Sequence, residues 1–248
     1  MMAQLAQIWR YPVKSHGREA IASARLTAGE CLHGDRVWAI AHEASKADNT
    51  AWSPCSGFTR VASSPALAAI KANLHDDGLT VTLSHPDQAT LTVAPDLQPD
   101  TLLDWVKPLT AEGRAAPARV VRVPGRGLTD SDYPSLTIGN LASHRAVEGR
   151  LGRPLQIERW RTNLWLDGLP AWEEFDWIGR HVQIGGAILR VVERTGRCAA
   201  PSANPDTGRR DTDLLTFLDQ QWDHQDFCVH AEVTQSGPIA TGDTAKVL

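Results

Sequence analysis

The segment of the chain best suited to chemistry is residues 194–201, with the sequence Arg-Thr-Gly-Arg-Cys-Ala-Ala-Pro. Cys198 follows a predicted strand there, on a turn that contains Gly196, with Arg194 and Arg197 as neighbours in sequence. Positive charge nearby lowers the pKa of a thiol, and the thiolate is both a nucleophile and a soft metal ligand. Cys198 is therefore a candidate nucleophile or metal ligand, and a cysteine that only packs is the alternative.

Three other short segments carry cationic and hydroxyl side chains next to predicted strands. They are residues 11–15 (Tyr-Pro-Val-Lys-Ser), 34–36 (Gly-Asp-Arg) and 159–163 (Arg-Trp-Arg-Thr-Asn). Such donors at strand ends would suit a phosphate or a pterin-like anion. Each segment also has an ordinary explanation: a solvated loop, a local Asp35–Arg36 ion pair, or a strand edge with exposed arginines.

Several other kinds of site are excluded. The chain has no glycine-rich nucleotide-binding motif and no Gly-x-Ser-x-Gly motif, and His224 and His230 lack the helical spacing of a zinc pair. Its four cysteines include no Cys-x-x-Cys. A net charge of −4 gives no basic field for nucleic acid. No apolar run suits a membrane span or a secretory signal, so we expect a cytoplasmic protein with neither a nucleic-acid nor a membrane partner.

The elements that must position these segments are mostly short strands. Alternating apolar residues and turn signals predict strands at residues 4–11, 36–42, 79–83, 89–93, 119–123, 163–166, 181–184, 187–192, 227–234 and 245–248. Helices are expected at residues 66–73, after Asp100, and at 141–151 and 214–222. Many short strands with few helices predict a β-rich α+β fold with a barrel or sandwich core. We place a domain division near residue 110.

The order and spacing of the motifs resemble the MOSC superfamily, and within it the bacterial relatives of the mitochondrial amidoxime-reducing component. The resemblance rests on the four segments above together with residues 167–170 (Asp-Gly-Leu-Pro), 179–180 (Gly-Arg), 184–186 (Ile-Gly-Gly), 204–208 (Asn-Pro-Asp-Thr-Gly) and 242–243 (Gly-Asp). It implies a MOSC N-terminal β-barrel-like domain at residues 1–110, followed by a MOSC β-barrel domain at residues 111–248.

The resemblance also implies a cofactor and the residues that hold it. The cofactor would be the molybdenum cofactor, Mo-molybdopterin, with Cys198 as the metal ligand and catalytic residue. The residues that match pterin and phosphate contacts, or that flank the ligand, are Lys14, Ser15, Arg36, Arg161, Asn163, Gly196 and Arg197. The chain departs from the amidoxime reducers at two positions, where Gly196 replaces a common serine and Thr195 replaces a cysteine.

The function implied by this resemblance is two-electron reduction of an N-hydroxylated or similar oxygen-bearing small substrate, independent of pyridoxal phosphate. Some bacterial relatives carry a fused ferredoxin domain, whereas this chain ends at Leu248, so we expect a separate ferredoxin- or cytochrome-like electron donor. Two alternatives stay open. Cys198 could carry a persulfide in a cofactor-carrier or sulfur-transfer protein, or the chain could be a binding module without catalysis.

Overall fold

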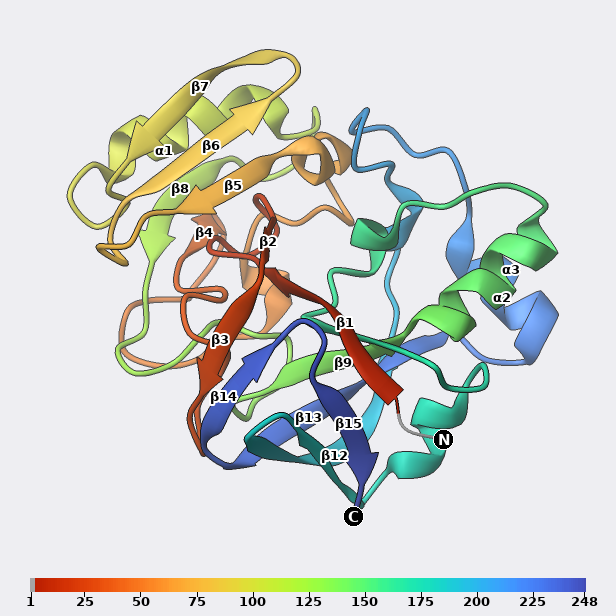
Figure 1. The fold of residues 1–248 in the computed structure, drawn as a ribbon. Helices are drawn as coiled ribbons and strands as arrows, with labels where there is room; N and C mark the ends of the chain where they lie inside the picture. The colour runs from red at the N-terminus through yellow and green to blue at the C-terminus, as the bar shows by residue number, and fades with distance from the viewer. Residues whose placement is uncertain (1–2) are drawn as a thin grey trace.

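The centre of the molecule is a closed barrel (Figure 1), seen in a computed structural model that describes residues 3–248. Its strands are β1 (Ala3–Arg10), β9 (Leu136–Asn140), β10 (Leu164–Asp167), β11 (His181–Ile184), β12 (Ala187–Gly196), β13 (Asp226–Gln235) and β15 (Thr244–Val247). They follow the order β10-β9-β13-β12-β11-β15-β1, and β1 pairs back onto β10. The first described strand thus closes a barrel whose other strands come from the second half of the chain.

The remaining strands form small sheets beside the barrel. They are β2 (Glu19–Ile21) on the edge of β1, β3 (Ser23–Leu26) with β14 (Gly237–Ala240), β4 (Ala39–His42) with β8 (Pro117–Val121), and the meander β5 (Lys71–Leu74), β6 (Val81–His85) and β7 (Gln88–Val93). The β5–β7 meander lies apart from the barrel, with α1 (Pro99–Val106) against it (Figure 1).

Helices α2 (Leu141–Leu151) and α3 (Leu214–Trp222) lie together on the other side of the molecule (Figure 1). Single 3-10 turns complete the elements: η1 (Cys55–Gly57), η2 (Pro65–Ala69), η3 (Lys107–Leu109), η4 (Ile157–Trp160), η5 (Glu173–Trp177) and η6 (Ala200–Ser202). The predicted β-rich α+β class is confirmed. No helix among residues 3–248 has the length and apolar character needed to span a membrane.

The barrel, the meander with α1, and the pair of helices α2 and α3 each pack on a separate hydrophobic core. The barrel is filled by alternate residues of its strands, such as Leu5, Leu189 and Val229, each fully buried. A second core lies beneath the β5–β7 meander and α1. A third fills the space between α2, α3 and the barrel and contains the stacked rings of Trp160 and Phe227. Burial of apolar area at about 25 cal/mol per Å² stabilises each of these parts.

Several local predictions are confirmed by the caps and turns that produce them. Helix α2 covers the predicted residues 141–151, and it ends at Gly152, whose φ of 72° is the left-handed conformation that favours glycine. Asp213 caps α3 by accepting a hydrogen bond from the Thr216 amide at 3.2 Å. The tight hairpin between β11 and β12 turns at Gly185 and Gly186 as expected.

Two local predictions are wrong. The helix expected at residues 66–73 is the short 3-10 turn η2 followed by strand β5, because Ala72 and Leu74 bury alternate side chains while β5 pairs with β6. The strand expected from residue 36 begins only at Ala39. Arg36 has a left-handed φ of 51°, and its amide donates to the Tyr11 carbonyl, so the chain turns towards the first segment before it enters β4.

Candidate functional site

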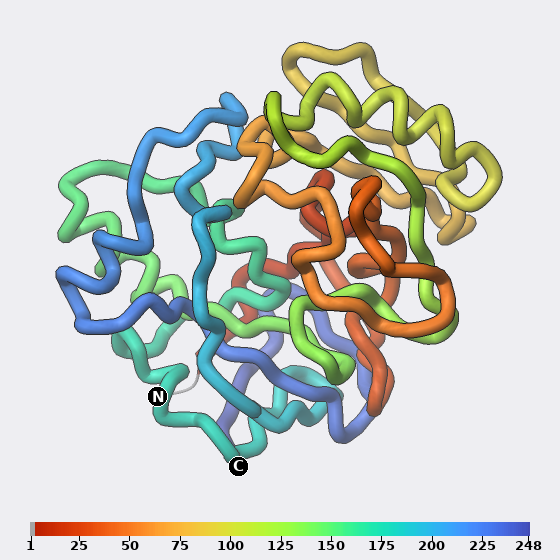
Figure 2. Tube along the Cα trace, turned by 180° about the vertical axis from the view of Figure 1, so that it is seen from behind, coloured from red at the N-terminus to blue at the C-terminus, as the bar shows by residue number. Residues whose placement is uncertain are grey.

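All eight residues predicted to form the site line one cavity of about 150 Å³, called here the central cavity. They reach it from four segments: the loop after β1, the turn before β4, the turn before β10 and the end of β12. The residues are Lys14, Ser15, Arg36, Arg161, Asn163, Gly196, Arg197 and Cys198. Segments more than a hundred residues apart in the sequence therefore converge at this end of the barrel, as the trace in Figure 2 lets the reader follow.

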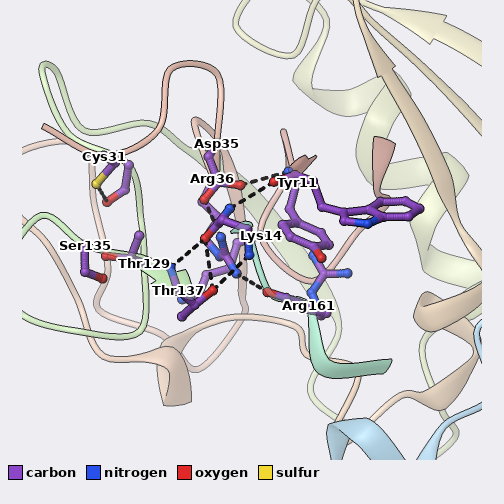
Figure 3. A network of polar contacts seen from close by, with 12 residues as sticks. Tyr11, Lys14, Cys31, Asp35, Arg36, Thr129, Ser135, Thr137 and Arg161 are labelled. Atoms are coloured by element: carbon purple, nitrogen blue, oxygen red, sulfur yellow. Dashed lines mark hydrogen bonds and ion pairs between the residues drawn. The ribbon is translucent and has the colours of Figure 1, made fainter. Parts of the chain in front are cut away.

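Tyr11 organises the cationic side of the central cavity. Its backbone amide donates to Asp35 Oδ1 at 2.8 Å, its carbonyl accepts from the Arg36 amide at 2.7 Å, and its hydroxyl donates to the Thr162 carbonyl at 3.0 Å. The guanidinium carbons of Arg36 and Arg161 lie 4.9 and 4.4 Å from the centre of its ring (Figure 3). A buried aromatic ring thus holds two arginines beside each other through cation–π contacts.

The backbone of the central cavity is strained at three residues that point into it. Ser15, Arg36 and Arg161 have φ values of 64°, 51° and 49°, the left-handed region that non-glycine residues rarely adopt. Such strain persists only where the surrounding contacts fix the conformation, and it is concentrated at ligand sites. Of the six non-glycine residues with positive φ in the described chain, these three line the cavity.

Arg36 and Arg161 differ in their electrostatic surroundings, because only Arg36 is paired with a carboxylate. Arg36 is ion-paired with the buried Asp35 carboxylate, and Asp35 raises its pKa even though burial works in the opposite direction. Burial and the neighbouring Arg36 lower the pKa of Arg161 to about 10, which still leaves it charged at neutral pH. Arg161 Nη2 is buried and has no hydrogen-bond partner within residues 3–248. This nitrogen is a donor whose hydrogen-bonding capacity is unused.

Lys14 is a third cation at the central cavity, and only 3% of its surface is exposed. Its ammonium donates to the Leu128 carbonyl at 2.7 Å and is paired with Asp130 at 2.5 Å. Burial lowers its pKa, and Asp130 opposes that shift. Lys14 therefore lines the cavity while its ammonium group is bonded to the segment that precedes β9.

Asn163 and Arg197 contribute to the cavity mainly by holding its shape. The Asn163 side chain accepts from the Thr137 amide and hydroxyl, both at 3.1 Å, and donates to the Trp9 carbonyl at 3.1 Å. The Arg197 guanidinium donates to the carbonyls of Phe227 and Trp160 at 2.6–2.9 Å. These bonds join β1, β9, β10, β12 and β13 around the cavity.

Cys198 is exposed and lies just after β12, on the wall of the central cavity. Arg194 and Arg197 are neighbours of Cys198 in the sequence. In the structure, however, both guanidinium groups contact other parts of the protein. Arg194 lies 4.4 Å from the centre of the Phe175 ring, and Arg197 bonds the carbonyls just described. The exposed thiol is thus accessible to a ligand in the cavity.

Other lining residues lie outside the predicted set of eight, although residues 159–163 as a segment were expected to supply donors. Arg60, Asp130, Arg159, Thr195 and His230 all contribute to the wall. Thr195 Oγ1 is buried and, in the part of the chain described, bonds to nothing. Thr195 has the same parity along β12 as the buried Ala187, Leu189 and Val191, so alternation of residues could have placed it inward. Burial, followed by Arg197, lowers the pKa of His230 to about 4, so this imidazole is neutral at pH 7.

The lining charges fit a polyanion. Three of the six cations at the cavity are paired with carboxylates: Lys14 with Asp130, Arg36 with Asp35, and Arg159 with Asp211. The other three, Arg60, Arg161 and Arg197, form no ion pair anywhere in residues 3–248. Guanidinium groups without a carboxylate partner favour phosphate and planar anions.

The chain belongs to the MOSC family: residues 2–121 match the model for the MOSC N-terminal beta barrel domain, and residues 130–246 match the model for the MOSC domain. Among known proteins it is similar to mitochondrial amidoxime-reducing component 1 of Mus musculus, with 23% identity over 242 residues, covering 84% of this chain and 67% of that protein. The division expected at residue 110 stays a prediction.

Solved structures with a related trace include YUAD protein from Bacillus subtilis, with a TM-score of 0.48 and 13% identity over 100% of this chain and 96% of that one. YiiM from Geobacillus stearothermophilus has a TM-score of 0.36 and 20% identity, and the alignment covers 46% of this chain and 53% of that chain.

Proposed function

We propose that this protein is a molybdenum-cofactor-dependent oxidoreductase that reduces N-hydroxylated or similar small substrates with electrons from a separate ferredoxin- or cytochrome-like protein. The observation that carries the proposal is the central cavity itself. It combines cations without carboxylate partners and an exposed thiol at one wall. Membership of the MOSC family and similarity to a protein named for amidoxime reduction support the same reading.

Different residues of the central cavity would ligate the metal, neutralise the charge of the cofactor and keep these groups in position. Cys198 would supply a thiolate to the metal, which soft metals accept readily. Lys14, Arg36 and Arg161 would neutralise the phosphate and pterin charge, and Ser15 and Thr195 would add hydroxyl donors. Asn163 and Arg197 would keep these groups in place through their bonds to the barrel backbone. Gly196 leaves space beside the ligand, since a Cβ there would meet only Asp226 Oδ1, at 3.7 Å.

The cofactor would supply the redox chemistry, while the protein binds and orients it. Overall, the N–O bond of the substrate breaks, two electrons arrive from the separate donor, and two protons complete the reduced product and one water. His230, uncharged at pH 7, lines the cavity without adding a cation to it, so the anionic cofactor is held by the arginines and Lys14.

The test is metal and pterin analysis of protein purified without chelators, combined with turnover of an amidoxime by a reduced viologen. We expect about one molybdenum and one pterin per chain and release of the amidine. Arg161→Gln should lower the cofactor content, while Arg150→Gln, an exposed arginine on α2, should leave it unchanged. Protein that contains neither metal nor pterin after expression with ample molybdate would contradict the proposal.

The exposure of Cys198 favours a second candidate, a carrier of cofactor or sulfur in which this thiol holds a persulfide. An exposed thiol can exchange sulfur with a partner protein, which a buried one cannot. A carrier would release sulfide from Cys198 on treatment with a thiol reductant and would not turn over amidoximes. Sulfide release without turnover would therefore select this candidate over the reductase.

A further inference from the structure

A second cavity of about 160 Å³ lies beside the central one and belongs to no part of the proposed reaction. It is formed by the end of β4, by the segment that follows η1 and by the loop after η3. One ordered water needs roughly 10–15 Å³ of such space, so this cavity has room for a small ligand. Its wall includes five hydroxyl-bearing residues and two arginines, and it includes no carboxylate.

Three polar atoms of this wall are buried without a partner. They are His42 Nδ1, Arg60 Nε and Thr110 Oγ1, half of all such atoms in residues 3–248. A buried polar group without a hydrogen bond costs about 1–3 kcal/mol. Three of them around one cavity, contributed by three separate segments, indicate that the wall is arranged to bond a polar ligand.

The chemistry of these atoms specifies the ligand. Arg60 Nε is a fixed donor, and Thr110 Oγ1 can donate or accept. His42 Nε2 lies 2.9 Å from the Ser56 carbonyl, which can only accept, so Nε2 carries a hydrogen. In the neutral ring, Nδ1 then accepts. Arg114 adds a second positive charge at the exposed edge of the wall.

We propose that this second cavity binds a small oxyanion, in particular a phosphate group. Phosphate offers oxygens to the two arginines and the threonine, and at neutral pH it retains an O–H that can donate to His42. The absence of any carboxylate from the lining means that an anion meets no repulsion there.

The second cavity is distinct from the central cavity but touches it through one side chain. Arg60 lines both, and its Nη1 donates to Cys55 Sγ, 3.6 Å away, on the central side. Phe58, which is buried, lines the second cavity, and the centre of its ring is 5.9 Å from Lys14 Nζ. His42, Thr110 and Arg114 line only the second cavity, so variants at these residues test it separately.

The experiment is calorimetric titration of the whole protein with inorganic phosphate, at constant ionic strength set with chloride. Thr110→Val keeps the shape of the side chain and removes only the hydroxyl, and Arg114→Gln removes an exposed charge. We expect each to weaken phosphate binding about tenfold or more, since a hydrogen bond or charge contact to an anion contributes this much. Without phosphate, Thr110→Val should melt at the same temperature as the wild type or higher, because an unpartnered hydroxyl is removed.

Two control variants separate this site from the central cavity and from general charge. Arg150→Gln removes an exposed arginine of α2, and Arg161→Gln removes a cation that lines the central cavity and not the second one. Both should leave the Thr110-dependent binding unchanged. Wild-type affinity for phosphate in Thr110→Val and Arg114→Gln would overturn the proposal, and so would a loss confined to Arg161→Gln. Failure of the cofactor test would leave this result unaffected.

Discussion

The floor and the ligand face of the central cavity both carry groups that can form hydrogen bonds, but these groups are bonded in opposite ways. The floor is the layer of buried side chains behind the lining: Tyr11, His16, Asp35 and Asn163, all at most 1% exposed. Of these four, only Asn163 lines the cavity itself. Their polar side chains bond to neighbouring backbone or side-chain groups. The ligand face consists of Arg161, Thr195 and Cys198. Two of these residues carry a buried atom without a partner in the described chain, and the third is an exposed thiol.

This difference separates residues that stabilise the structure of the site from residues that are available to bind a ligand. A buried polar group that is fully bonded fixes the positions of the segments around it, and its loss destabilises the fold. A buried polar group left without a partner destabilises the fold and gains its hydrogen bond only from a ligand. Substitutions on the floor should therefore change stability, and those on the ligand face should change binding.

The largest expected effect on the floor is that of Asp35→Asn. The carboxylate is paired with Arg36 and also accepts from the Tyr11 amide, so its neutralisation leaves the 8%-exposed Arg36 without a counter-charge. We expect the free energy of unfolding to fall by about 3 kcal/mol, measured by urea denaturation. The exposed Asp76→Asn should change it by less than about 0.5 kcal/mol. If the free energy of unfolding fell equally in the two variants, Asp35 would not be a stabilising residue of the floor.

A pH series probes the floor through His16, which is fully buried and lies 2.6 Å from the Lys14 carbonyl. Burial lowers its pKa from 6.5 to about 4. Between these values the unfolded chain binds more protons than the folded one, so the free energy of unfolding falls as the pH falls from 6.5 to 4. The contribution of this one group is about 3 kcal/mol.

The variant His16→Gln should show a shallower loss of stability over the same window, whatever its stability at pH 7. The measurement is the midpoint of urea unfolding at half-unit steps of pH. His230, whose pKa burial also lowers to about 4, leaves a residual slope in the variant. A slope identical to that of the wild type would show that His16 does not carry this pH dependence.

A direct comparison of the two regions pairs Asn163→Leu with Thr195→Val. The first leaves the Thr137 amide and the Trp9 carbonyl without their side-chain partner, and we expect about 2 kcal/mol of destabilisation. The second removes a buried hydroxyl that bonds to nothing in residues 3–248, so the variant should be as stable as the wild type or more stable. Cofactor content should fall in Thr195→Val. If Thr195→Val proved the more destabilising of the two, the division into floor and ligand face would be wrong.

The sequence predicted the ligand face better than the floor. Motif spacing predicted two of the three ligand-face residues, Arg161 and Cys198, but only Asn163 of the four floor residues, because a family resemblance records which residue types recur at which separation. It could not reveal that the Asn163 amide is used inside the barrel, since that depends on β1 pairing with β10. The β11–β12 hairpin and α2 were predictable because their turns and caps are local.

The missed parts depend on distant contacts. Strand β5 resembles a helix in sequence, and only its pairing with β6 makes it a strand. The left-handed Arg36 is fixed by a hydrogen bond to Tyr11, twenty-five residues earlier in the chain. Arg60 has no recognisable motif around it, although it lines both cavities. Tertiary contacts of this kind override local preference and leave no short-range signal.

The ligand assignment of Cys198 is the central claim, and Cys55 offers a matched control because it lines the same cavity. Each is replaced by serine in turn, and Cys31, outside that cavity, serves as a second control. The measurements are amidoxime turnover with a reduced viologen and the visible absorption of a thiolate-bound metal.

For Cys198→Ser we predict turnover at background, no thiolate-to-metal absorption and pterin still bound. The stability of this variant should be within about 0.5 kcal/mol of the wild type, since an exposed thiol contributes little packing. Cys55→Ser and Cys31→Ser should keep both activity and absorption. Full activity with an unchanged spectrum in Cys198→Ser, or their loss in Cys55→Ser instead, would contradict the assignment of Cys198 as the metal ligand.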